Sequence, residues 1–238
     1  MTITITVLVI LVIGTTYKYK IADIIWEISP QNIFSEKMLE DYKVSCDKSG
    51  VVIPAQKGNS AKEYQNILEC LNYRLVRDFD GIMIHAAAIV YNDKGYLFAA
   101  PSGTGKTTHI SLWQQHFRDE IRILNGDKPF IRYEDGDFYV YGSPWQGKEN
   151  LGYNGRVKLG GIYILERAKQ NSICKADSHQ VLNGLIKSVL IENNIDDRLK
   201  TLDLLNRISG SVPVHLLYCN TQADAAYITK QHIDSGVQ

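Results

Sequence analysis

The stretch that decides the fold reads Ala99-Ala100-Pro101-Ser102-Gly103-Thr104-Gly105-Lys106-Thr107-Thr108. An apolar run, Tyr96 to Ala100, comes directly before it. A segment with apolar residues at helical spacing, Thr107 to Phe117, follows it. A glycine-rich turn between a strand and a helix is a setting that binds phosphate groups. The sequence therefore predicts a phosphate-binding loop at this point in the chain.

Gly103 and Gly105 let backbone N–H groups curl around phosphate oxygens without a Cβ in the way. We expect the nucleotide to be held by this loop, whose remaining predicted contacts are Ser102, Thr104, Lys106, Thr107 and Thr108. The helix that begins near Lys106 adds the positive end of its dipole. The alternative is a loop of small residues that only looks like a nucleotide site.

Two side chains in this loop have predicted chemical roles. Lys106 would reach the β- and γ-phosphates of ATP, and the Thr107 hydroxyl would bind Mg²⁺. One position departs from the general pattern G-x-x-x-x-G-K-[ST], because Ala100 stands where the first glycine is expected. Alanine can replace that glycine if its φ angle is negative.

The 238-residue chain carries 26 basic and 26 acidic residues, so its formal net charge is zero. This balance does not favour an electrostatic nucleic-acid binder. The cysteines lie far apart in sequence, which disfavours a zinc site and is typical of thiols in a reducing compartment. They are Cys46, Cys70, Cys174 and Cys219. We expect a cytoplasmic protein.

The amino-terminal run Thr2 to Gly14 is almost entirely apolar and β-branched. It is shorter than the roughly 20 residues that span a bilayer, so we favour a strand over a membrane segment. A second strand, Tyr17 to Ile28, would pair with it as a hairpin. Residues 1–80 are predicted to be a β-rich segment with one helix, packed on a core formed by residues 81–238.

The helix of that first segment is predicted over residues 61–77. Ser60 and Glu63 have the S-x-x-E spacing of a capping box, and apolar residues then fall on one helical face. A short strand is predicted over Gly50 to Pro54.

His85 lies in a predicted strand, Ile82 to Val90, which precedes a turn and the strand leading into the loop. If Tyr91 pairs with Tyr96, His85 lies opposite Ser102, at the mouth of the loop. His85 is therefore a candidate catalytic residue. The alternative is a histidine of the core.

Asp127 follows another predicted strand, Glu120 to Leu124. A carboxylate at the end of the strand after the loop's helix is a candidate Mg²⁺ ligand and general base. The alternative is a turn residue, since Asn125-Gly126-Asp127-Lys128-Pro129 is also turn chemistry. The polar stretch Gly142 to Asn150 would approach the phosphates or the acceptor, or would be a structural turn.

The remaining elements follow from apolar periodicity. They are a hairpin of residues 130–133 and 138–141, strands over 160–166 and 212–218, and helices over 178–191, 199–208 and 222–230.

The segment from His85 to Lys148 resembles the HPr kinase/phosphorylase family and its short relatives. The run Ser102 to Thr108 is also similar to that of the ATP-dependent phosphoenolpyruvate carboxykinases. His85-Ala86-Ala87-Ala88 looks like the family's histidine-bearing strand, and Asn125 to Pro129 looks like its paired-aspartate motif. Gly126 stands where the first aspartate is usual.

This resemblance implies an α/β fold in which the phosphate-binding loop lies in a compact, mixed sheet. It implies ATP and Mg²⁺ as cofactors, and a serine hydroxyl on a small protein or precursor peptide as the acceptor. It also allows a homo-oligomer. Three functions follow as hypotheses: a serine kinase, a nucleotide-dependent carboxykinase, and a nucleotide-binding regulatory protein without catalysis.

Overall fold

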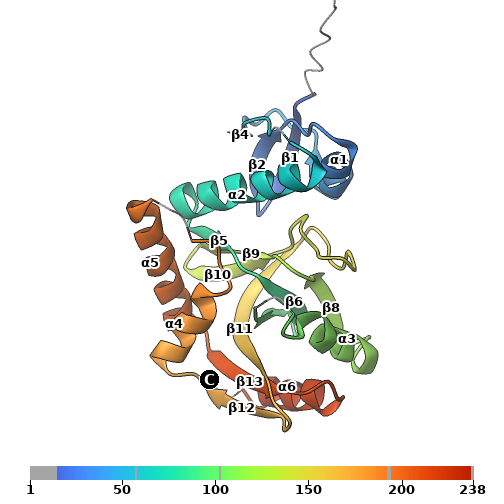
Figure 1. The fold of residues 1–238 in the computed structure, drawn as a ribbon, viewed down its shortest axis with the longest axis vertical. Coiled ribbons are helices and arrows are strands. Elements are labelled where there is room, and N and C mark those ends of the chain that lie inside the picture. The colour runs from blue at the N-terminus through green and yellow to red at the C-terminus, as the bar shows by residue number, and fades with distance from the viewer. Residues whose placement is uncertain (1–14, 57, 102, 192–193, 237–238) are drawn as a thin grey trace, which may run out of the picture.

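The computed structural model describes residues 15–56, 58–101, 103–191 and 194–236. The strand predicted over Thr2 to Gly14 and the loop residue Ser102 lie outside these residues. The described chain is a mixed α/β fold with two sheets, and the long helix α2 (Ser60–Asp78) runs between them (Figure 1).

The smaller sheet has the strand order β3-β1-β2-β4. Its strands are β1 (Tyr17–Ile21), β2 (Ile24–Ile28), β3 (Lys43–Val44) and β4 (Val51–Ile53). Between β2 and β3 lie α1 (Ile33–Leu39) and a single 3₁₀ turn (Glu40–Tyr42).

The prediction of one strand over Tyr17 to Ile28 is wrong, because that segment is itself a hairpin. Ala22 and Asp23 turn the chain with φ angles of 52° and 58°. Two successive positive φ angles match the twist of paired strands, although the usual signal is Asn-Gly or Asp-Gly. Because Ala22-Asp23 is neither of these dipeptides, the sequence did not predict a turn here.

Alternate residues of this hairpin, including Tyr19 and Trp26, are buried against α2. The face of α2 that covers them carries Ile67, Leu68 and Leu71, as the periodicity predicted.

The capping box predicted for α2 is wrong. The cap is Asn59, whose side chain accepts a hydrogen bond from the Lys62 N–H at 3.0 Å. Glu63 is fully buried and instead accepts a hydrogen bond from the Ser35 hydroxyl at 2.8 Å. A contact to α1 thus replaces the local one.

The larger sheet has the order β5-β9-β10-β11-β7-β6-β8, with β13 paired to β11 and β12 to β13. Its strands are β5 (Gly81–Met83), β6 (Ala86–Tyr91), β7 (Lys94–Ala99), β8 (Ile121–Asn125), β9 (Phe130–Glu134), β10 (Asp137–Tyr141), β11 (Arg156–Arg167), β12 (Ser172–Lys175) and β13 (Val214–Cys219). β7, β11 and β13 are parallel and the other pairs are antiparallel, so the sheet is mixed, as expected.

The strand predicted over Ile82 to Val90 breaks in two at Ile84 and His85. The Ile84 N–H donates to the Pro129 carbonyl at 3.1 Å, and the His85 N–H donates to the Ser188 carbonyl at 2.6 Å. These bonds leave the regular ladder. β5 consequently pairs with β9, whereas β6 lies between β7 and β8.

The register predicted for the β6–β7 hairpin is also wrong. Asn92 and Asp93 form a two-residue turn with φ angles of 47° and 55°, so Tyr91 pairs with Lys94. Because Ala86 pairs with Ala99, the next pair along would bring His85 level with Ala100, and not with Ser102.

Helices cover both faces of the larger sheet (Figure 1). α3 (Lys106–His116) and α6 (Asp224–Asp234) pack on one face, and α4 (Ser178–Ile186) and α5 (Ile195–Ser211) on the other. Successive residues of β6 show this division, since Ala87 and Ile89 belong to the α3 side and Ala88 and Val90 to the α5 side. No helix in the described ranges is long and apolar enough to cross a membrane.

The helix predicted over residues 178–191 ends early, at Ile186. The Ser188 carbonyl is used by the His85 N–H, and Val189 forms a bridge with Ile84. Residues 188 and 189 therefore do not continue the helix, because they pair with the backbone of Ile84 and His85 between β5 and β6.

Candidate active site

The ends of three neighbouring strands, β6, β7 and β8, lie side by side at one end of the larger sheet, which we call the site edge. β7 and β8 both run antiparallel to β6, so the ends of β7 and β8 lie beside the start of β6. The predicted loop follows the end of β7, Asp127 follows the end of β8, and His85 precedes the start of β6. The topology thus gathers the three predicted site elements at a single edge.

The loop after β7 is open above its glycines. Gly103 and Gly105 have φ angles of 77° and 125°, which disfavour other residues. A Cβ on either would meet no atom of the described chain within 4 Å. Gly105 begins α3 without a side-chain cap. The first-turn N–H groups of α3 and the positive end of its dipole therefore face a site that an anion can occupy.

Lys106 is almost buried, with 7% of its surface exposed, and its Nζ donates to the Ala100 carbonyl at 2.9 Å. Burial lowers the pKa of Lys106 to about 8, although the Asp127 charge raises it and Lys128 lowers it further. The Asp127 carboxylate is thus close enough to act on the loop lysine. Among the described residues Ala100 is not one with positive φ, so alanine fits at this position.

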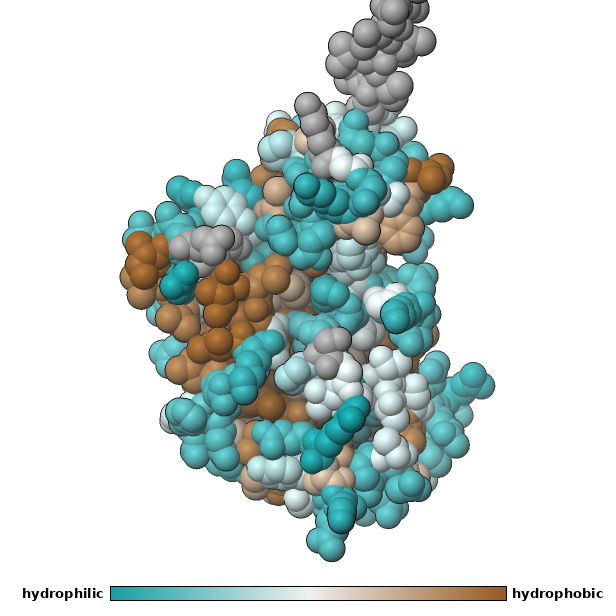
Figure 2. Space-filling model, viewed as in Figure 1, coloured by the Kyte–Doolittle hydropathy of each residue, from teal (hydrophilic) through white to brown (hydrophobic). Residues whose placement is uncertain are grey.

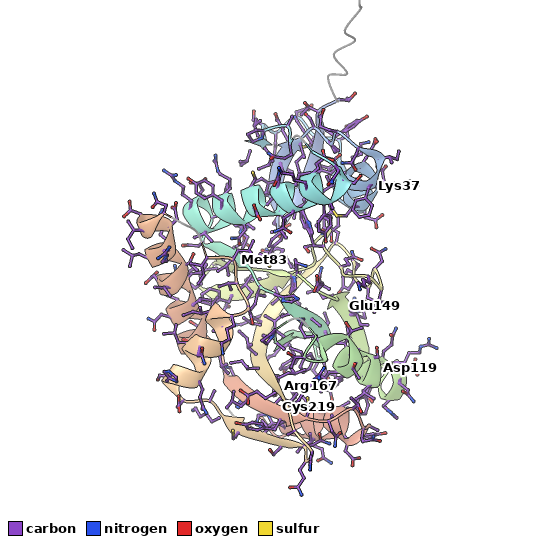
Figure 3. The ribbon with its side chains drawn as sticks, in the orientation of Figure 1. Lys37, Met83, Asp119, Glu149, Arg167 and Cys219 are labelled. Atoms are coloured by element: carbon purple, nitrogen blue, oxygen red, sulfur yellow. The ribbon has the colours of Figure 1, made fainter. Side chains whose placement is uncertain are left out.

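Arg167, the last residue of β11, holds the loop from the sheet side. Its Nε donates to the Thr104 carbonyl at 3.0 Å, and its Nη2 donates to the Gly103 carbonyl. Figure 3 shows Arg167 next to Cys219, the last residue of the parallel strand β13. The loop conformation is therefore tied to the parallel pairing of β7 with β11.

Asn125 builds the turn that presents Asp127. Its buried Oδ1 accepts hydrogen bonds from the N–H groups of Asp127 at 2.9 Å and Lys128 at 2.8 Å. Its Nδ2 donates to the Ser143 carbonyl at 3.0 Å. Such a side chain, bonded to the backbone two residues on, is an Asx turn.

His85 and Lys128 both contact the Asp127 carboxylate. The His85 Nε2 lies 3.0 Å from Oδ1, and the Lys128 Nζ pairs with Oδ2. Burial raises the pKa of Asp127, but the hydrogen bonds and charges of His85 and Lys128 outweigh it and lower that pKa to about 2. Asp127 is therefore a carboxylate at neutral pH, and it is partly accessible, with 20% of its side chain exposed.

Gly126 stands at the position where the paired-aspartate motif that this segment resembles has its first aspartate. A Cβ at this position would lie 2.7 Å from the Gln146 carbonyl oxygen and 3.3 Å from that of Leu151. The Gly126 N–H donates to the same Leu151 carbonyl at 2.8 Å. The loop of residues 142–152 thus packs too closely for any side chain at 126, which leaves a single carboxylate here.

The oxygen donors at this edge suit a magnesium ion that arrives with a nucleotide. Mg²⁺ keeps several waters and commonly takes only one or two protein ligands plus phosphate oxygens. The Asp127 carboxylate and the Thr107 hydroxyl, in the first turn of α3, provide such a pair of donors. A cage of three or more acidic, histidine or cysteine side chains is not found in the described part of the chain.

The structure brings His85 to Asp127, and Asp127 near Lys106. Thr108, also predicted to contact the nucleotide, is exposed in the first turn of α3. Sequence reasoning missed the parts played by Asn125, Lys128 and Arg167. The spacing Asn125-Gly-Asp-Lys was a local signal for the Asx turn. Arg167 carried no such signal, because its contact depends on strand pairing.

The structural interpretation of the segment Gly142 to Asn150 holds for Trp145, and its approach to a substrate stays a prediction. Trp145 is fully buried, and its Nε1 donates to the Tyr64 carbonyl at 3.3 Å, so it is structural. Gln146, Gly147 and Lys148 line a cavity that Asp127 also lines.

No protein-family model matches this sequence, and no curated protein is found to be similar to it. Among solved structures, the Hpr(Ser) kinase/phosphatase from Coxiella burnetii resembles 65% of this chain over 97% of its own length, at 10% sequence identity and a TM-score of 0.39. With a TM-score below 0.5, this likeness supports no conclusion about the chain's activity.

Proposed function

We propose that this chain is an ATP-dependent, Mg²⁺-requiring kinase that transfers the γ-phosphoryl group to a serine hydroxyl of a small protein or precursor peptide. One observation supports the proposal most directly. An open glycine loop and an accessible carboxylate, that of Asp127, lie at the same end of the larger sheet. The influence of the Asp127 charge on Lys106 supports their closeness. Phosphoryl transfer needs mainly positioning and charge neutralisation, which these groups supply.

The loop and the start of α3 would bind the phosphates through backbone N–H groups. Lys106 would exchange its hydrogen bond with the Ala100 carbonyl for phosphate oxygens. Thr107 and Asp127 would hold the metal ion, which when bound neutralises charge on the phosphate oxygens. Ser102 is proposed to contribute to the same loop.

In the transfer step, the serine oxygen forms a bond to the γ-phosphorus while the bond from that phosphorus to the β–γ bridging oxygen breaks. The serine proton goes to the Asp127 carboxylate, and ADP leaves with the electron pair of the broken bond. His85 keeps the carboxylate oriented through its contact with Oδ1. The low pKa of Asp127 suits a loose transition state, in which the proton moves late.

A second function, nucleotide binding without catalysis, is favoured by one observation. Lys128 pairs with the Asp127 carboxylate, and Gly126 has no room for a second carboxylate beside it. A regulatory protein that binds nucleotide would need no free base.

Phosphate transfer from radiolabelled ATP separates the two functions. The purified protein is incubated with [γ-³²P]ATP and Mg²⁺, with a library of peptides that each contain one serine. Label on serine that depends on Mg²⁺ supports the kinase. Tight binding of an ATP analogue with no transfer to any peptide and no release of phosphate would instead support the regulatory protein.

A further inference from the structure

A cavity of about 730 Å³ lies against Asp127, and we call it the α1 cavity. Its walls come from two parts of the chain that are distant in sequence. Phe34 and Met38 of α1 and Tyr64 of α2 form one wall, and the other comes from the loop of residues 142–152, through Pro144, Gln146, Gly147, Lys148 and Asn150. The α1 cavity therefore lies between the helices of the smaller sheet and the site edge of the larger one.

The inner surface of the α1 cavity is largely aromatic and aliphatic. The rings of Phe34 and Tyr64 lie 5.9 Å apart, and those of Tyr64 and Trp145 5.8 Å apart. Phe34 keeps 52% of its surface exposed, so the cavity is open to solvent beside α1. Figure 2 shows apolar side chains at the surface over α1. An exposed aromatic side chain next to a reacting group favours an apolar contact from a ligand.

The charges on the α1 cavity are basic. Lys37 and Lys148 line it, and neither has an ion pair within the described residues. Asp127, the one acidic residue lining it, is already paired with Lys128 and His85. Glu149 lies on the same loop, below Lys37 in Figure 3, but it does not line the cavity. The Glu149 Oε2 would lie 3.7 Å from a Cβ on Gly147, behind this wall, so the side chains that face an occupant directly are two basic groups and one paired carboxylate.

The inner end of the α1 cavity reaches the carboxylate that the proposed transfer uses. A Cβ placed on Gly147 would lie 3.2 Å from the Asp127 Cβ, so the loop wall directly contacts this residue. Any hydroxyl that enters from the open side beside α1 can approach Asp127 without crossing the nucleotide loop.

We propose that the α1 cavity binds the acceptor, and that this acceptor is an extended peptide segment with an apolar side chain and an acidic group close to its serine. The inference rests on the proposed kinase function, to which it adds the position and chemistry of the second substrate. The apolar side chain would pack against the exposed side of Phe34, beside Tyr64. The acidic group would meet Lys37 and Lys148, and the serine would lie nearest Asp127.

Three fluorescein-labelled 12-residue peptides test this, each with one serine: one of leucine and aspartate, one of leucine and lysine, and one of asparagine and aspartate. Fluorescence anisotropy gives the dissociation constant of each, with and without an ATP analogue and Mg²⁺. We expect the leucine–aspartate peptide to bind at least about tenfold more tightly than either other peptide, a difference of about 1.4 kcal/mol. Similar affinities for all three, or no binding by any, would overturn the assignment.

Variants locate the binding. Lys37→Glu combined with Lys148→Glu should remove or reverse the preference for aspartate over lysine, and Phe34→Ala should weaken the leucine peptides. Lys48→Glu, between β3 and β4, and Val52→Ala, in β4, are matched controls, since both residues are exposed and neither lines the cavity. They should leave every affinity unchanged. Equal effects of the cavity and control variants would also reject the proposal.

The failure of this inference and that of the kinase proposal give different results. Nucleotide affinity is measured in the same samples by titration with the ATP analogue. Analogue binding without a peptide preference contradicts only the acceptor site. Peptide preference without any analogue binding leaves the peptide site but rejects the kinase.

Discussion

The imidazole Nε2 of His85 lies 3.0 Å from Oδ1 of Asp127. His85 belongs to the short segment between β5 and β6, where the chain leaves one strand and enters the other. The break frees His85 from the ladder, and a backbone hydrogen bond from the Ala86 N–H to the Asp127 carbonyl, 3.0 Å long, holds the two segments together. The pair is therefore fixed by backbone as well as by side chains.

Asp127→Asn is expected to lower the rate of phosphate transfer by about 10²-fold or more, because general-base catalysis alone contributes 10²–10⁴-fold. Nucleotide affinity should fall less, since Lys106 and the loop amides remain. Single-turnover transfer from labelled ATP, together with titration by an ATP analogue, measures both. Near wild-type transfer by this variant would show that another group accepts the proton. His85→Gln would then be the first variant to test, because His85 contacts the same carboxylate.

Lys106→Ala should abolish tight binding of the Mg²⁺–nucleotide complex while the fold persists. Lys106 lies at the end of the glycine loop, where the charge of Asp127 acts on its ammonium group. Lys94→Ala is the matched control, since Lys94 is exposed at the start of β7, the end of that strand farther from the loop. Calorimetric titration with an ATP analogue gives the two affinities. Unchanged affinity in Lys106→Ala would reject the nucleotide site.

Gly126→Ala is expected to destabilise the protein by about 1–3 kcal/mol, the usual effect of overpacking. Its Cβ would lie 2.7 Å from a backbone carbonyl oxygen, and backbone cannot move aside as the end of a long side chain can. Gly210→Ala, in α5, is the control, because a Cβ there would meet no atom within 4 Å of it. Urea unfolding compares both variants with the wild type. A midpoint for Gly126→Ala equal to that of the wild type would contradict the close approach.

Stability should fall with acid between pH 6.5 and about 3 because of His109. Burial lowers the pKa of His109 from 6.5 to about 3, while its Nε2 accepts a hydrogen bond from the Trp113 Nε1 at 3.1 Å. In this window the unfolded chain binds a proton at His109 that the folded chain does not, so unfolding is favoured as pH falls. The slope contributed is up to about 1.4 kcal/mol per pH unit.

Replacing His109 by glutamine should reduce that slope, whatever it does to stability at pH 7. Urea unfolding at several pH values between 4 and 7 measures the slope for both proteins. Identical slopes would mean that His109 takes up its proton in the folded state as readily as in the unfolded one.

The parts of the site that could be predicted are those coded by neighbouring residues. The strand, the Gly103–Gly105 turn and α3 are adjacent in sequence, and Asp127 follows its strand directly. The hairpin of β9 and β10 was likewise expected, and it is confirmed. In each case a local pattern was sufficient, because no distant group competed for the same backbone.

The errors arose where a distant group did compete. The break at His85 depends on the Ser188 carbonyl, which no periodicity around residue 85 reveals. Glu63 matched a local cap, but the Ser35 hydroxyl holds it instead. The space at Gly126 is closed by the carbonyls of Gln146 and Leu151, so the reason for this glycine became visible only in three dimensions.

The Asn125 amide joins the turn of Asp127 to the loop that walls the α1 cavity. Its oxygen holds the N–H groups of Asp127 and Lys128, and its nitrogen holds Ser143, at the root of the loop that walls the α1 cavity. The Lys128 N–H also donates to the Trp145 carbonyl of that loop at 3.1 Å, so displacement of the loop by the proposed acceptor would be passed to the turn that carries the carboxylate. Thermodynamic reciprocity makes any effect of the acceptor on nucleotide affinity equal to the effect of nucleotide on acceptor affinity. In the proposed kinase, removal of the Asn125 amide would therefore weaken any such coupling between the two substrates.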